Sequence, residues 1–166
     1  MLKIKDHPAL KQRFRFLIQE GLGLAYFKEE GKYFRFRFEG MIHVLEIDPE
    51  DAPFIWIACF RFYSIKQPNA EQLSRADVAI NRANLLLKGV KVVRNLEPDS
   101  DGSYAVSSSI SFLVEDAESH SAEALERYLN MIKVGRRHFV ELYEQEDESE
   151  PEQEQEQKSE TVQVVH

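Results

Sequence analysis

The chain has 166 residues, of which 43% are hydrophobic, so it can build one continuous core but would be cramped as two independent domains. Its single cysteine, Cys59, excludes an internal disulfide. No stretch approaches the roughly 20 apolar residues that span a bilayer. The first ten residues lack the apolar run of a signal peptide, so we expect a cytoplasmic protein.

The net charge of −8 is concentrated at one end of the chain. Residues 141–166 hold ten acidic residues and one lysine, a net charge of −9, which leaves +1 for residues 1–140. The folded part is therefore expected to be nearly neutral, and the acidity belongs to an appended tail.

The first half of the chain predicts one helix and then four strands. Asp6 can cap a helix over residues 6–21, which Gly21 ends. Strand patterns follow, separated by glycine turns or prolines, over residues 22–28, 33–38, 41–47 and 54–65. In the second of these strands Phe34, Phe36 and Phe38 alternate with Arg35 and Arg37. This alternation predicts that the rings face the core and the arginines face solvent.

The second half predicts a helix, a hairpin and a long helix. Asn69 and Gln72 have the spacing of a capping box, and the helix that they begin ends at Gly89. Strands are expected over residues 90–96 and 104–114, joined by a turn at Asp101-Gly102, and a helix over residues 117–143. Residues 144–166 lack periodicity and are rich in Glu, Gln and Ser, so we expect a disordered acidic tail after a domain of residues 1–143.

The order of elements is therefore α-β-β-β-β-α-β-β-α. Single strands and helices do not alternate, which favours an antiparallel α+β fold over a parallel nucleotide-binding sheet. We expect the helices to pack on one face of the sheet.

The sequence predicts no catalytic residue, cofactor site or metal site, and we expect a protein that is not an enzyme. Gly21-Leu22-Gly23 closes a helix rather than opening one, unlike a phosphate-binding loop, and the five histidines have no short spacing. Cys59 stands among apolar residues, where a thiol behaves as a small buried group. The acidic residues of 46–51 have the composition of a solvated turn.

Three arginines are the candidate partner-binding residues: Arg35, Arg37 and Arg61. They are interleaved with phenylalanines, as in sheets that bind single-stranded nucleic acid by stacking bases on rings. Alternation, however, puts the rings and the arginines on opposite faces, and the nearly neutral domain disfavours nucleic acid. An arginine face is equally suited to an acidic peptide, including the chain's own tail.

The chain resembles the type III secretion chaperone-like fold, and within it the YbjN-type family of bacterial domains, often labelled sensory transduction regulators. The resemblance rests on the order of elements and on the stretch 79–84, Ala-Ile-Asn-Arg-Ala-Asn, followed by the strand, the Asp101-Gly102 turn, the second strand and the long last helix. It implies a compact protein that binds polypeptides or assembles as a dimer, with no catalytic residues. Asn81 and Asn84 are expected to bond neighbouring backbone or to contact a ligand.

Three functions remain open on the sequence. The first is a chaperone-like protein-binding module that presents a sheet face or edge to a polypeptide segment. The second is a small-molecule-binding or enzymatic domain with a pocket between sheet and helices, and the third is a single-stranded nucleic-acid binder.

A homodimer is also expected, because the apolar surface of the helix within residues 69–89 extends further around it than one sheet contact requires. In this interpretation the helix packs on its symmetry mate. The expected interface residues are Ala76, Ala79, Ala83 and Leu86.

Overall fold

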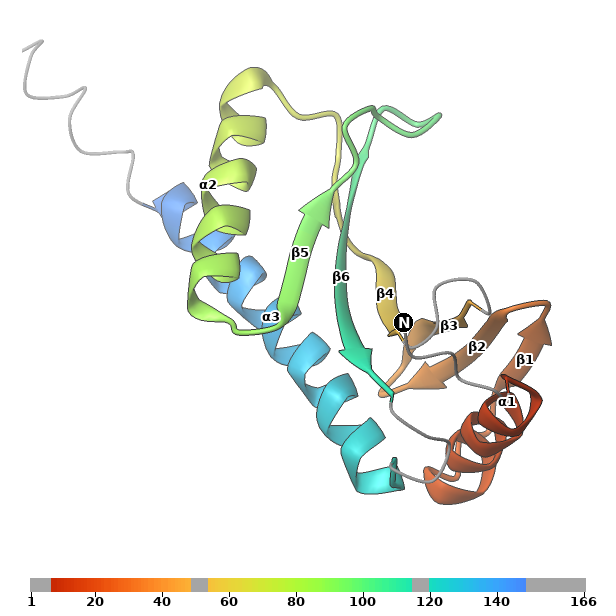
Figure 1. The fold of residues 1–166 in the computed structure, drawn as a ribbon. Helices are drawn as coiled ribbons and strands as arrows, with labels where there is room; N and C mark the ends of the chain where they lie inside the picture. The colour runs from red at the N-terminus through yellow and green to blue at the C-terminus, as the bar shows by residue number, and fades with distance from the viewer. Residues whose placement is uncertain (1–6, 49–53, 115–119, 149–166) are drawn as a thin grey trace, which may run out of the picture.

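The computed structural model describes residues 7–48, 54–114 and 120–148, and their helices and strands follow the predicted order (Figure 1). In chain order the elements are α1 (His7–Phe16), the π-helical turn η1 (Leu17–Gly21), β1 (Phe27–Glu30), β2 (Tyr33–Phe38), β3 (Met41–Ile47), β4 (Phe54–Ile65), α2 (Ala70–Leu86), β5 (Val90–Arg94), β6 (Tyr104–Leu113) and α3 (Ala122–Glu148). The α+β fold class is therefore confirmed.

The strands form one six-stranded sheet in the order β1-β2-β3-β4-β6-β5, in which every neighbouring pair is antiparallel. The first four strands are a meander, as their glycine turns predict. After β4 the chain passes through α2 and reaches the far edge as β5, and β6 then returns between β5 and β4. The two edges of the sheet are thus β1 and β5.

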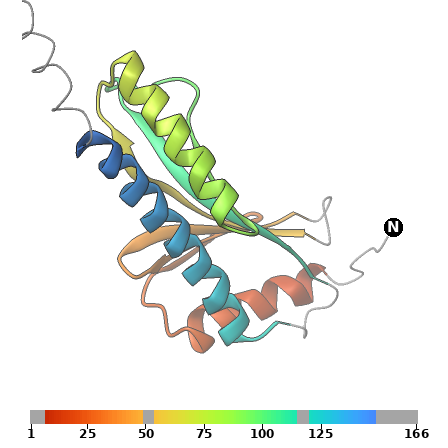
Figure 2. The same ribbon diagram turned by 90° about the vertical axis from the view of Figure 1, so that its left-hand side faces the viewer.

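The helices lie on one face of the sheet, as Figure 2 shows for α2 and α3. The core explains this arrangement, because inward residues of β2, β3 and β4 pack in one cluster with α1, η1 and the first half of α3. Phe34 and Phe36 are fully buried there, which confirms that their rings face the core, while Phe38 is partly buried. A second cluster joins α2 to the end of α3 over β5 and β6.

Several boundaries differ from the expected ones; helix α3, for example, begins at Ala122 rather than at residue 117. The first strand begins at Phe27 rather than at residue 22, because Gly23 takes a positive φ of 59° and interrupts the extended chain. Leu22 and Leu24 pack against the core without pairing. Helix α3 continues to Glu148, since Glu and Gln are good helix formers, and the remainder of the expected tail, residues 149–166, lies outside the described residues.

Helix α2 is fixed at both ends by its asparagines. Asn69 and Gln72 form the predicted capping box, with hydrogen bonds of 2.8 and 3.0 Å. Near the other end, the Asn84 amide donates to the Val92 carbonyl oxygen at 2.9 Å and accepts from the Val92 N–H at 2.7 Å. Asn84 therefore bonds backbone, and it closes the outer edge of β5 at the point where a partner strand would otherwise pair.

Replacing Asn84 with alanine is expected to lower the free energy of unfolding by about 1 to 3 kcal/mol, because both Val92 backbone groups lose their partner in a partly buried site. Denaturant unfolding measures the change. The matched control is Asn81→Ala on the exposed side of the same helix, for which we expect a change within about 0.5 kcal/mol. Equal losses in the two variants would contradict the role of Asn84.

No helix in the described part of the chain combines the length and the apolar character required to cross a membrane.

Candidate functional site

The sheet face opposite the helices, which we call the open face, carries a set of exposed apolar side chains. Six large apolar side chains on this face are more than a third exposed: Tyr33, Ile42, Phe54, Phe60, Val93 and Leu113. Exposed apolar side chains gathered on one face often mark a binding site. The open face is therefore the candidate binding surface.

A groove of about 770 Å³ runs across β2, β3 and β4 on the open face, and we call it the open-face groove. Its lining residues are Tyr33, Arg35, Ile42, Val44, Glu46, Trp56, Phe60 and Arg61. Trp56 and Phe60 meet edge to face, with their ring centroids 5.4 Å apart. The groove thus combines an aromatic floor with charged side chains.

A bulge in β4 brings Phe60 and Arg61 to the same face. The pairing of β4 with β6 shifts register between Cys59 and Tyr63, and Arg61 takes a positive φ of 51°. The Arg61 N–H donates to the Ser107 hydroxyl at 3.2 Å. A left-handed, non-glycine residue at a bulge is strained, and such bulges re-aim side chains near functional sites.

Because of this bulge, the predicted placement of Phe60 and Arg61 is wrong. Strict alternation predicted that Phe60 and Arg61 lie on opposite faces, but the extra residue places both on the open face and returns Phe62 to the core. The open face therefore carries rings and arginines together.

The three candidate arginines are only partly brought together. Arg35 and Arg61 line the groove, whereas Arg37 is exposed further along β2 and is not among the lining residues. Arg35 lies 3.6 Å from a Glu30 carboxylate oxygen, and Arg61 lies 3.1 Å from Asp99. Both side chains are about half exposed, so these ion pairs are weak and can exchange with a ligand.

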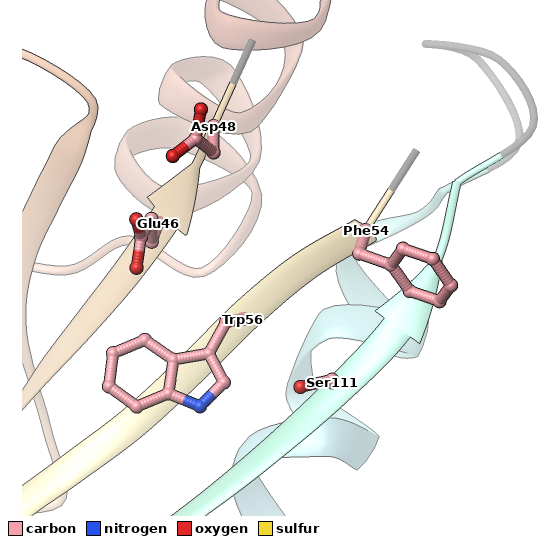
Figure 3. Close-up of a pocket in the computed structure, with 5 residues that line it drawn as sticks. All are labelled: Glu46, Asp48, Phe54, Trp56 and Ser111. Carbon is pink, nitrogen blue, oxygen red and sulfur yellow. The ribbon is translucent and has the colours of Figure 1, made fainter. Parts of the chain in front are cut away.

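A smaller hollow of about 280 Å³ adjoins the groove, since the two share Glu46 and Trp56 (Figure 3). It is also lined by Asp48, Phe54 and Ser111, and Figure 3 shows the two carboxylates on one side and the Phe54 ring on the other. The Lys32 Nζ atom lies 2.5 Å from a carboxylate oxygen of Asp48 and 2.5 Å from one of Glu46. The hydrogen bond to Asp48, followed by the one to Glu46, makes the largest contribution to raising the pKa of Lys32.

The acidic residues of 46–51 were predicted to form a solvated turn. The two of them that the structure describes instead form an ion-pair network at the surface. Glu46 and Asp48 are tied to Lys32. The remaining acids of that segment, Glu50 and Asp51, lie outside the described residues. Within the residues that the structure describes, no three His, Cys, Asp or Glu side chains are placed to hold a metal ion together.

The four residues of the expected dimer interface differ in exposure. Ala76, Ala79 and Ala83 are fully buried within the single chain, in the cluster that joins α2 to α3 and the sheet. Their small side chains permit close packing inside the domain, so they have no surface to offer a second copy. Leu86 remains 65% exposed and its neighbour Leu85 is 85% exposed. A dimer through α2 would use these leucines, and it stays a prediction.

Cys59 is fully buried, as its apolar neighbours predict. Burial raises the pKa of its thiol, and the nearby Arg136 opposes this shift. The thiol is therefore protonated at neutral pH and belongs to the core.

Four groove residues were missed by sequence reasoning: Tyr33, Ile42, Val44 and Trp56. The signal was present, because each is a large apolar residue at the outward position of its strand, where alternation calls for a polar one. Two-sided apolar strands in a sheet with helices on only one face indicate a surface that binds something.

No protein-family model and no curated protein matches the chain. Solved structures share its fold. An uncharacterised protein from Methanothermobacter thermautotrophicus superposes with a TM-score of 0.56 at 10% identity, covering 82% of this chain and 98% of its own. YbjN from E. coli, described as a candidate transcription regulator, has a TM-score of 0.55 at 11% identity, covering 88% of this chain and 97% of its own. The chain thus has a YbjN-like fold.

Proposed function

We propose that the protein is a non-catalytic, chaperone-like binding module that holds an extended polypeptide segment in the open-face groove. The observation that carries the proposal is the groove itself, with exposed rings in the middle and half-exposed arginines at its rim. In protein interfaces the binding energy is typically concentrated where the partner covers aromatic side chains and polar or charged residues surround them.

The blocked edge of β5 directs the polypeptide to the face rather than to that edge. Asn84 occupies both outward backbone groups of Val92, so a partner strand cannot continue the sheet there. A peptide in the open-face groove would instead bury side chains against Trp56 and Phe60. This mode makes side-chain pockets, more than backbone pairing, the source of selectivity.

The same surface suggests a second candidate, a single-stranded nucleic acid, because rings and arginines share one face. The charges favour the polypeptide. Glu46 and Asp48 lie in and beside the groove and share the cation Lys32, so this cluster keeps a net negative charge that would repel phosphates.

The test uses Trp56, the only tryptophan of the chain, as a reporter. Peptides selected from a random library on the immobilised full chain are titrated into it while the Trp56 emission is followed. We expect the emission to change on binding, and Phe60→Ser to weaken the affinity on the order of tenfold or more, because the partner loses its central aromatic contact.

The matched control is Phe16→Ser on α1, since Phe16 is 52% exposed and Phe60 47% exposed. We expect Phe16→Ser to bind like the unaltered chain. Equal weakening by both variants, or peptides that bind without any change in Trp56 emission, would refute the groove as the site. Tighter binding of oligouridylate than of any selected peptide, with a steep loss of affinity as salt rises, would favour the nucleic-acid candidate.

A further inference from the structure

A second apolar groove lies at the end of α2, on the helical side of the molecule and away from the open face. Its volume is about 390 Å³, and we call it the helix-end groove. Its lining residues are Leu87, Lys88, Val90, Arg127, Asn130, Met131 and Val134. They come from the turn after α2, the start of β5 and the first half of α3.

The packing of α3 on β5 forms the floor of this groove. Gly135 lets the two elements approach so closely that an added Cβ would lie 2.8 Å from Val90 Cγ1. The last turn of α2 also carries Leu85 and Leu86, which are 85% and 65% exposed and precede the lining residue Leu87 in the chain without lining the groove themselves. The end of α2 therefore exposes apolar side chains in addition to those of the groove, and such patches often mark binding sites.

The charges of the helix-end groove differ from those of the open-face groove. Of the seven lining residues, Lys88 and Arg127 are cations and none is acidic. The open-face groove contains Glu46 and two arginines that have carboxylate partners. The helix-end groove therefore fits a segment that is both acidic and apolar.

The chain itself contains such a segment. Within residues 149–166, the stretch 156–165 carries Glu156, Lys158 and Glu160, a net charge of −1, and after Thr161 it continues with Val162, Val164 and Val165. Acidic residues followed by a short run of valines match an apolar groove flanked by cations.

We propose that the helix-end groove is a docking site for an acidic apolar segment and that its occupant is residues 156–165 of the same chain. The valines would cover the apolar floor of the groove, and Glu156 and Glu160 would lie beside Lys88 and Arg127. This docking is independent of the proposed function, because it leaves the open-face groove free.

Chain length permits the contact within one molecule. Helix α3 runs antiparallel to α2, with Arg75 of α2 over the ring of Tyr143, so α3 ends beside the start of α2 (Figures 1 and 2). From Glu148 back to Val134 the helix spans about 21 Å, at about 1.5 Å per residue. The same number of residues, extended from Glu148 to Val162, reaches about 46 Å. A tethered segment has an effective concentration near the millimolar range, so even weak contacts give docking.

The experiment places a photoreactive benzophenone amino acid at position 163 of the full chain, and maps the crosslinks by mass spectrometry after irradiation. We expect crosslinks within one chain to residues 85–90 and 127–134. The double variant Lys88→Glu, Arg127→Glu is expected to lower their yield severalfold, as is raised salt, since both remove the attraction between the groove and the glutamates.

The matched control is Arg35→Glu with Arg61→Glu, which reverses the two cations of the open-face groove and is expected to leave the yield unchanged. A Val162→Ser, Val164→Ser variant should lose the crosslinks while keeping its charge. Crosslinks to the open face, crosslinks only between two chains, the absence of crosslinks to the folded part, or a yield indifferent to Lys88→Glu, Arg127→Glu would each overturn the proposal.

Discussion

Replacing Phe36 with alanine is expected to lower the free energy of unfolding by roughly 3 to 5 kcal/mol, because the change removes buried apolar area and leaves a cavity. Phe36 is fully buried in the centre of β2, where it pairs with Phe27 on one side and with His43 on the other. Its ring stacks on the His43 ring with centroids 5.8 Å apart, so the neighbours cannot close the space without breaking this contact.

Denaturant unfolding of the full chain measures the loss, with Phe54→Ala as the matched control. Phe54 is 51% exposed at the start of β4, so its truncation is expected to cost less than about 1 kcal/mol. A Phe36→Ala variant with nearly unchanged stability and lost binding to single-stranded RNA would move Phe36 from the core to a binding surface.

Periodicity explains why most of the fold was predictable. The alternation in β2 identified its buried face, and the asparagine cap located the start of α2. Both are local effects of residues within a few positions of one another. The end of α3 was not predictable in this way, because a Glu and Gln tract is compatible with a helix and with disorder, and the preceding helix decides between them.

The open-face groove was only half predictable, because its geometry depends on one non-local irregularity. Arg35 and Arg61 were identified as candidates, but the bulge that sets Arg61 beside Phe60 arises from the pairing of β4 with β6. Alternation within β4 carries no sign of it. The alanines of α2 show the same limit of sequence patterns. A stripe of small residues suits packing within a chain as well as packing between chains, and only the position of α3 shows that these alanines pack within the chain.

The protein is expected to lose stability as the pH falls from about 6.5 toward 4, through His43. His43 on β3 is almost fully buried between the rings of Phe36 and Phe38. Burial lowers its pKa to about 4, and the nearby Arg136 guanidinium adds to the effect, while the Met41 carbonyl and Glu39 oppose it. The neutral ring is held with Nδ1 3.1 Å from the Met41 carbonyl oxygen, to which it donates.

The direction follows from proton binding. Between the unfolded pKa of 6.5 and the folded pKa of about 4, the unfolded chain binds a proton at this residue and the folded chain does not. Lowering the pH therefore favours the unfolded state, and the stability present above pH 6.5 is lost progressively toward pH 4. At 1.36 kcal/mol for each pH unit the full loss is about 3 kcal/mol.

The measurement is the free energy of unfolding at a series of pH values for the full chain and for His43→Phe, which keeps a stacked ring but cannot titrate. The carboxylates titrate in both proteins, so the difference between the two curves isolates His43. We expect this difference to change by about 2 to 3 kcal/mol between pH 7 and pH 4. Parallel curves for the full chain and His43→Phe would show that His43 is not buried in its neutral form.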